Sequence, residues 1–283
     1  MKETGWVATA KDEGRSLQDV LATWMKVSRR VAKQHIDARV AWVNDRCVWM
    51  ARHTVKRGDR VRVTCAVASP TAKANVPKKI TVLFEDNDYM VVDKPVGMLA
   101  NGGDASAEAV ARSMKGVAGI QAVHRLDRET SGCLLLAKNA DAFEAAVAVF
   151  REHRISKTYR VIVYGRWDAK ASTIDLPVDG KRALSQITCV SAANAASYLV
   201  VHIETGRTHQ IRKHLAMARH PVVGDREYGP KHVRETVFQG VTRSLLHAAD
   251  IAMDHPLREG QQLKASSPIP PDFHRWLDAL KLR

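Results

Sequence analysis

Cysteine is scarce in this chain of 283 residues, and the familiar cofactor and metal patterns are missing. Its four cysteines, Cys47, Cys65, Cys133 and Cys189, form no Cys-x-x-Cys pair, and the twelve histidines form no His-Glu-x-x-His pattern. We therefore expect reduced thiols, no disulfide framework and no metal site. Gly102-Gly103 stands without the surroundings of a nucleotide-binding fingerprint, so we also expect no cofactor.

Long apolar runs are missing as well. None comes near the ~20 residues that cross a bilayer, and residues 1–14 are polar, without the apolar segment of a secretory signal. No amphipathic helix with a large apolar face stands out, so we expect no membrane partner. Together with reduced thiols, these absences lead us to expect a cytoplasmic protein.

Acidic residues are outnumbered, and the imbalance is uneven. Residues 1–79 hold 17 lysines and arginines against 7 acidic residues, a net charge of +10, out of +14 for the whole chain. Residues 80–283 hold 27 against 23, a net charge of +4. A basic surplus of this size favours a nucleic acid as partner. A basic surface that serves only solubility is the simpler alternative.

The first 64 residues predict a small α+β domain. Serines at 16 and 28 are suited to begin two helices, and Asn44-Asp45 to make a turn between two strands. The expected helices are 16–25 and 28–37, and the expected strands are 40–44, 47–50 and 60–63. Arg29, Arg30 and Lys33 should point outward on the second helix.

This order of helix, helix and hairpin resembles an S4-type RNA-binding module over roughly residues 15–63. The matching strings are Ser28-Arg29-Arg30, Val43-Asn44 and Gly58-Asp59-Arg60-Val61. The sequence departs from the pattern where Ala38 or Arg39, and Asp45, replace expected glycines. The resemblance implies that Arg29, Arg30 and Lys33 contact RNA; a small domain for dimer contacts is the alternative.

Residues 65–79 are rich in alanine, proline, lysine and serine without a period, and we expect a linker there. We therefore expect three parts: an RNA-binding domain at 1–64, the linker, and a larger domain at 80–283. The expected strands of the larger domain are 80–84, 89–92, 133–137, 157–165 and 198–203, and the expected helices are 104–115 and 140–153. Phe143, Val147 and Phe150 should face inward from the second of these helices.

Residues 123–132, Val-His-Arg-Leu-Asp-Arg-Glu-Thr-Ser-Gly, form a polar segment ahead of a buried strand. Such a loop can present reactive side chains from a rigid scaffold. The neighbouring Arg125 and Arg128 favour the ionised form of Asp127 and would suit a phosphodiester substrate. A surface turn with an ordinary ion pair is the alternative.

The string from His124 to Gly132 closely resembles the signature of the RluA-type pseudouridine synthases, the ribosomal large subunit RNA pseudouridine synthases. Further matches follow in the family's order and extend the resemblance over about residues 80–275. They are Lys94-Pro95-Val96-Gly97, Lys157 to Arg160, Glu204 to Arg212, His220 to Gly229, Leu245 to Ala248 and Asp254 to Leu257. Arg219 replaces a usual glycine.

The resemblance implies an α+β catalytic domain with a mixed, largely antiparallel sheet. It implies an isomerase that turns specific uridines of structured RNA into pseudouridine without a cofactor, most of all in 23S ribosomal RNA. The C1′–N1 bond breaks, the uracil turns, and a C1′–C5 bond forms. RNA is then the expected partner, DNA is not, and we expect a monomer.

The resemblance also implies the roles of individual residues. Asp127 is the catalytic carboxylate, Arg212 pairs with it, and Tyr159 stacks near the target uracil. We ourselves expect Arg125 to help fill the space that the uridine leaves or to hold the neighbouring phosphate. Thr208 is suited to cap a helix, on which His209 and Arg212 share a face. The expected substrate contacts are His124, Arg125, Arg128, Lys157, Thr208 and His209.

Three alternatives stay open. The substrate could be transfer RNA, the chain could be an RNA-binding ribosome-assembly factor without activity, or Asp127 could serve a glycosylase-like hydrolysis that releases free uracil. A uridine-isomerisation assay on purified RNA tests the second alternative, and detection of free uracil tests the third. Mapping pseudouridine across all RNAs in a strain with and without this gene would identify the RNA.

Overall fold

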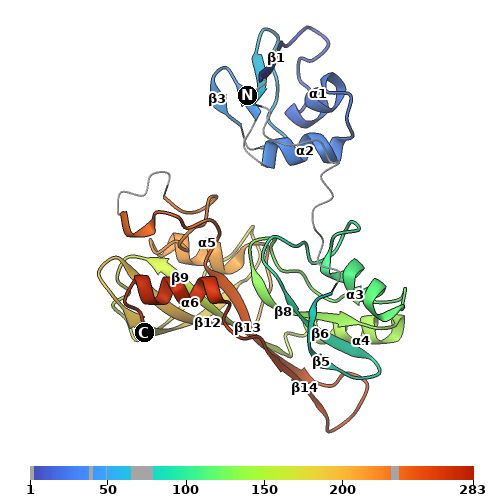
Figure 1. Cartoon of the computed structure of the whole chain (residues 1–283), viewed down its shortest axis with the longest axis vertical. Helices are drawn as coiled ribbons and strands as arrows, with labels where there is room; N and C mark the ends of the chain where they lie inside the picture. Colours follow the sequence, from blue (N-terminus) through green and yellow to red (C-terminus); the bar gives the residue numbers. More distant parts are fainter. Residues whose placement is uncertain (1–2, 38–40, 49, 65–78, 231–235) are drawn as a thin grey trace. The chain divides into compact units, whose positions relative to one another are not determined.

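The chain folds as two compact units, residues 1–75 and 76–283 (Figure 1). The computed structural model describes residues 3–37, 41–48, 50–64, 79–230 and 236–283. The expected linker, residues 65–79, lies outside the described residues apart from Lys79, as do parts of the expected strands at 40–44 and 47–50. In the described part of the chain, no helix combines the length and apolarity that crossing a membrane requires.

The first unit packs two helices on a four-stranded antiparallel sheet of order β1-β4-β2-β3. Its elements are β1 (Glu3–Val7), α1 (Leu17–Trp24), α2 (Arg29–Asp37), β2 (Ala41–Val43), β3 (Arg46–Cys47) and β4 (Arg60–Thr64). Ser16 caps α1 as expected, because its Oγ accepts the backbone N–H of Asp19 at 3.2 Å. Asn44 and Asp45 turn the chain with φ of 48° and 61°, which their short polar side chains tolerate.

Strand β1 is the element that the sequence did not predict in this unit. It lies in the polar segment at the start of the chain and pairs with β4, with Glu3 opposite Thr64 and Val7 opposite Arg60. The partner strand is more than fifty residues away, so a local pattern gives little sign of the pairing.

The second unit is built on a ten-stranded mixed sheet, which confirms the predicted fold class. Its main order is β10-β11-β12-β9-β13-β8-β6-β5, with β14 beside β13 and β7 beside β8. Every pairing between these strands is antiparallel except β8 with β13. The strands are β5 (Thr81–Glu85), β6 (Tyr89–Lys94), β7 (Gln121–Ala122), β8 (Ser131–Ala137), β9 (Ile155–Tyr164), β10 (Ala171–Asp175), β11 (Leu184–Ala192), β12 (Ala196–Ile203), β13 (Leu246–Asp254) and β14 (Gln262–Ser266).

Helices cover both faces of this sheet (Figure 1). They are α3 (Ala107–Lys115), α4 (Ala140–Arg151), α5 (Gln210–Met217) and α6 (Pro271–Ala279), with a 3-10 turn at Thr236–Phe238. Strand β8 is buried along its whole length. Its Leu134 and Leu136 join the core under α3 and α5, whereas Leu135 joins the core under α4, as the alternation of a strand requires.

Helix α4 contacts the sheet through a different stripe from the one predicted. Its buried residues are Ala142, Ala146 and Val149. Phe143 and Phe150 pack at the margin of the same core and are only partly buried, and Val147 is half-buried. Small side chains face the sheet, so the helix can approach it closely while the larger rings flank the contact.

The parallel pair of β8 and β13 brings two distant loops together at the strand starts. Ser131 lies opposite His247 and Gly132 opposite Ala248. Gly132 has φ of 110°, and a Cβ there would lie 2.1 Å from the carbonyl oxygen of Ala248. Only glycine permits so close a backbone approach.

Candidate active site

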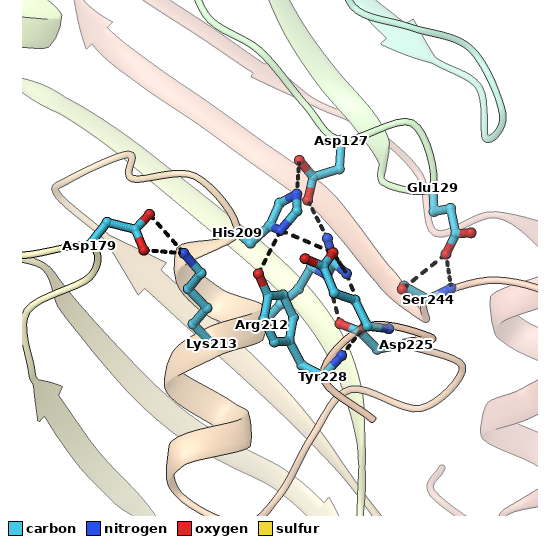
Figure 2. A network of polar contacts seen from close by, with 10 residues as sticks. Asp127, Glu129, Asp179, His209, Arg212, Lys213, Asp225, Tyr228 and Ser244 are labelled. Atoms are coloured by element: carbon cyan, nitrogen blue, oxygen red, sulfur yellow. Dashed lines mark hydrogen bonds and ion pairs between the residues drawn. The ribbon is translucent and has the colours of Figure 1, made fainter. Parts of the chain in front are cut away.

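Asp127 is presented by a loop just before β8 that is fastened through the two residues following it, Arg128 and Glu129. The Glu129 carboxylate accepts the backbone N–H of Ser244 at 3.1 Å and its hydroxyl at 3.2 Å. On the other side, Arg128 donates from Nε to the Gly97 carbonyl at 2.9 Å and accepts the Gly97 N–H at 2.8 Å. The loop is therefore tied to the segment after β6 and to the segment before β13. Figure 2 shows the second of these contacts, between Glu129 and Ser244.

Lys94 also holds the segment after β6 and the Asp127 loop in place. Its side chain is fully buried, and its ammonium donates to the carbonyls of Pro95 at 3.0 Å, Met98 at 2.9 Å and Arg128 at 3.5 Å. Burial lowers the pKa of Lys94 to about 8, because the charged form loses its hydration there. The sequence analysis matched the string Lys94 to Gly97 to the family but gave the lysine no role.

The turn before α5 differs from the prediction in one respect. Thr208 does not cap the helix: the residue at the N-cap position is His209, with φ of 56° and no capping side chain. Instead the Gln210 side chain accepts the N–H of Arg207 at 3.1 Å and the hydroxyl of Thr205 at 2.7 Å. The left-handed backbone at His209 replaces the extended conformation of an ordinary cap.

Arg212, on the first turn of α5, gathers three carboxylates (Figure 2). It binds Asp225 through Nε and Nη2 at 2.6 and 2.8 Å, Glu227 through Nη2 at 3.2 Å, and Asp127 Oδ2 through Nη1 at 3.3 Å. Its guanidinium carbon also lies 5.0 Å from the centre of the Tyr228 ring. Burial opposes the charge, but the hydrogen bonds to Asp225 and the carboxylates around it raise the pKa of Arg212. The guanidinium therefore stays charged.

Asp225 is the buried half of this arrangement. Its side chain is fully buried, and burial alone would raise its pKa. The hydrogen bonds from Arg212 and from the N–H groups of Glu227 and Tyr228 outweigh burial and lower the pKa of Asp225. The ion pair fixes the orientation of Arg212 through two parallel bonds.

Asp127 and Arg212 line the same open pocket, together with Tyr159 of β9. Burial raises the pKa of Tyr159, so its hydroxyl stays protonated. A concave site that combines apolar side chains with polar and charged ones suits a single base drawn out of an RNA stack. The lining residues are Arg125, Leu126, Asp127, Thr130, Tyr159, Ile203, Gly206, Arg207, Thr208, His209, Gln210, Ile211, Arg212 and Leu246.

Six of the nine catalytic and substrate-contact residues expected from the sequence line this pocket: Asp127, Tyr159, Arg212, Arg125, Thr208 and His209. The other three support the pocket from outside its lining. His124, Lys157 and Arg128 each bind backbone groups of other segments, and the sequence motifs do not reveal these partners.

His124 does not face the pocket. Its Nε2 accepts the N–H of Leu135 at 3.0 Å, and its ring stacks on Phe150 with centres 5.3 Å apart. Burial lowers the pKa of His124 to about 3, so the ring is neutral. It braces the segment that leads into the loop carrying Asp127.

Lys157 and Arg128 are braces as well. The Lys157 ammonium donates to the carbonyls of Thr205 at 3.2 Å and Glu204 at 3.4 Å, which holds the turn before α5. Burial lowers the pKa of Lys157 to about 8. Arg128 is exposed and bound to Gly97.

Sequence reasoning missed Asp225, Glu227 and Tyr228. The string His220 to Gly229 matched the family pattern but carried no assigned role. An aspartate directly after a glycine, followed by a glutamate and a tyrosine, was the signal available. All three contact Arg212 or His209 (Figure 2).

Comparison with known proteins gives a consistent result. The family model described as RNA pseudouridylate synthase matches residues 88–217. Ribosomal large subunit pseudouridine synthase C of Pasteurella multocida is 30% identical over 258 residues, which are 81% of this chain and 79% of the relative. Ribosomal large subunit pseudouridine synthase D of Xanthomonas campestris pv. campestris is 30% identical over 260 residues, 81% of this chain and 78% of the relative.

Solved structures show the same fold. Human RNA pseudouridylate synthase domain containing 4 superposes with a TM-score of 0.61 at 22% identity, covering 72% of this chain and 94% of that protein. Sequence and fold agree, and the chain belongs to the RluA family of RNA pseudouridine synthases, which are isomerases of uridine in RNA.

Proposed function

We propose that this synthase isomerises specific uridines of 23S ribosomal RNA, with Asp127 as the catalytic carboxylate. The observation that carries the catalytic assignment is the position of Asp127 at the pocket, 3.3 Å from the permanently charged Arg212. The names of the relatives, large-subunit synthases C and D, support ribosomal RNA as the substrate.

The reaction conserves every atom of the nucleotide except for exchanged protons. The C1′–N1 bond breaks, the uracil turns within the pocket, and C5 bonds to C1′. C5 then loses its proton, and N1 gains one. Asp127 acts beside the Arg212 guanidinium, which offers fixed positive charge and neither accepts nor donates a proton.

The pocket walls fit a uracil that has left its stack. Tyr159 offers an aromatic surface of the kind that holds unpaired bases. Arg125 is exposed at the pocket, where it can fill the vacated stack or bind a neighbouring phosphate. Thr208 is also exposed at the rim and completes the proposed substrate contacts.

We propose further that the first unit is an S4-like RNA-binding module. Its helix pair, hairpin and basic surplus support this role. On α2, Arg29 and Lys33 are exposed, and Arg29 forms an ion pair with Asp19 at 2.8 Å. The side chain of Arg30 lies outside the described residues.

The test of the catalytic assignment is Asp127→Asn, which nearly keeps the size and removes the charge. Because C5 must lose its hydrogen, release of tritium from RNA labelled at uridine C5 measures the reaction. We expect no release, with RNA affinity within about tenfold of the wild type, or ~1.4 kcal/mol.

The same assay separates the alternatives. Release by the Asn variant at a near wild-type rate would refute the assignment of Asp127. Free uracil among the products would indicate hydrolysis. Activity on transfer RNA but not on 23S transcripts would assign the enzyme to transfer RNA. Mapping pseudouridine in cells with and without the gene would then identify the modified position.

A further inference from the structure

His209 lies between the catalytic loop and the segment that follows Gly224, and its two ring nitrogens face different partners. Nε2 lies 3.5 Å from Asp127 Oδ1. Nδ1 lies 3.0 Å from the Tyr228 hydroxyl and 3.4 Å from Glu227 Oε2 (Figure 2). The residue adopts φ of 56°, a conformation that costs energy for a side chain with a Cβ. This backbone geometry begins α5 with the imidazole directed at Asp127.

The two oxygens of Asp127 are in unlike surroundings. Arg212 commits Nε and Nη2 to Asp225 and offers Nη1 to Oδ2 of Asp127. The other oxygen, Oδ1, faces His209. A carboxylate bound through one oxygen can still rotate about its last bond, whereas one bound through both cannot.

The charge state of His209 follows from the groups around it. Burial and the adjacent Arg212 lower its pKa, and Asp127, Glu227 and Asp225 oppose this shift without reversing it. The ring is therefore neutral at pH 7 and carries a single N–H. Its usefulness to Asp127 depends on which nitrogen holds that proton.

Tyr228 and Glu227 both face Nδ1 of the ring. Burial and Glu227 raise the pKa of Tyr228, so its hydroxyl keeps its proton, which it can donate to Nδ1 or to the Glu227 carboxylate. When it donates to Nδ1, the ring proton is on Nε2, directed at Asp127. The opposite tautomer would point a lone pair at the carboxylate, which is electrostatically unfavourable.

We propose that His209 is a positioning residue whose Nε2–H holds Oδ1 of Asp127 while Arg212 holds Oδ2, with Tyr228 fixing the tautomer. The inference rests on the proposed role of Asp127. The 3.5 Å separation suits a free site, since such contacts commonly shorten when the substrate enters. The carboxylate thereby presents one orientation to the flipped uridine.

The test compares His209→Gln with His209→Leu. Both keep a Cβ in the left-handed conformation, but only glutamine retains an N–H donor near the position of Nε2. Measured as single-turnover tritium release at saturating RNA, the Leu variant should lose about 10²-fold, the scale for a lost preorganised donor. The Gln variant should recover most of this rate, and both should bind RNA within about threefold of the wild type.

A second variant tests the tautomer. Tyr228→Phe keeps the ring beside Arg212 and removes the hydroxyl. It should slow the chemical step in the wild-type background and have no further effect when combined with His209→Leu, because the two residues act in one chain of contacts. Additive losses would refute the role of Tyr228.

The outcomes separate a failure of the role given to His209 from a failure of the proposed function. Equal losses in the Gln and Leu variants, or a Leu variant at the wild-type rate, would overturn the role of His209 while an inactive Asp127→Asn leaves the proposed function standing. An active Asp127→Asn would overturn both. If the Leu variant unfolds, a Gln variant that is folded but slow by 10²-fold is the overturning result.

Discussion

Arg212 is oriented by Asp225 before any substrate arrives. Its bonds to the buried Asp225 are 2.6 and 2.8 Å, whereas its contact with Asp127 is 3.3 Å. The short pair fixes the plane of the guanidinium, and the remaining Nη1 then points at the Asp127 carboxylate. Such an arrangement stabilises charge without reorganising during the reaction.

Replacing Arg212 with methionine should therefore affect two properties at once. The chemical step should fall by at least ~10²-fold, the scale of a lost electrostatic partner. The free energy of unfolding should fall by ~3–5 kcal/mol, because Asp225 is left buried and unpaired. Single-turnover tritium release measures the first effect, and urea denaturation measures the second.

A matched control separates these effects. The double variant Arg212→Met, Asp225→Asn removes the uncompensated charge, so it should regain stability while the chemical step stays slow. A double variant that regains the wild-type rate would mean that Arg212 contributes only to stability.

At this scale, the sequence predicted which segments would meet but not the direction of every side chain. The strings around Asp127 and Arg212 come to one pocket, as the resemblance implied. His124 and Lys157 belong to the same strings and support the pocket through backbone groups instead. A motif specifies neighbours along the chain, whereas burial and backbone partners in three dimensions decide where a side chain points.

Among the elements, the parallel strands β8 and β13 determine where the segments with Asp127 and Ser244 lie. Asp127 precedes β8 and Ser244 precedes β13, and Glu129 joins the two segments. A side chain at Gly132 would collide with the backbone of Ala248 and force these strands apart. The register between the starts of β8 and β13 therefore sets the position of the loop that carries Asp127.

Gly132→Ala should destabilise the protein and slow the reaction together. The φ of 110° and the blocked approach lead us to expect a loss of about 2 kcal/mol or more in the free energy of unfolding. Gly116→Ala is the matched control, because Gly116 has φ of 67° at the end of α3 and open space for a Cβ. The control should lose about 1 kcal/mol and keep its rate.

Denaturation and single-turnover rates check this pair of variants. Equal losses of stability in both, with no change of rate at Gly132, would contradict the role given to the β8–β13 contact.

Local patterns predicted most elements but not their long-range contacts. The fully apolar run that becomes β8 and the serine that begins α1 are readable from neighbouring residues. Strand β1 depends on β4, and the buried stripe of α4 depends on how closely it approaches the sheet. Neither of these dependencies is contained in a short stretch of sequence.

For the whole molecule, the uneven charge predicts how RNA affinity responds to salt. If the first unit makes about four phosphate contacts, the log–log slope it adds is roughly −2.8 on single strands and −3.6 on duplex, with DNA values as a guide. Between 50 and 200 mM salt this corresponds to a loss of roughly 50- to 150-fold in affinity. A shortened chain that begins near residue 78 should lack this contribution.

The intact chain offers a finer version of the same measurement. Changing Arg29 and Lys33 to glutamine should reduce the magnitude of the slope by about 1.4, for two contacts on a single strand. Changing the exposed Lys170 and Lys264 of the second unit is the control and should leave the slope unchanged. Identical slopes for all of these proteins would mean that the first unit does not bind RNA. If the shortened chain loses its single-turnover rate at saturating RNA, the first unit helps to assemble the site.

The β8–β13 pair also governs when during its own synthesis the protein becomes an enzyme. Asp127, Tyr159 and Arg212 have all been polymerised by residue 212, yet the catalytic loop is fastened to Ser244 and its strand to Ala248. We therefore expect a nascent chain that already contains these three residues to be inactive. Activity should begin only when β13 has left the ribosome and docked between β8 and β9.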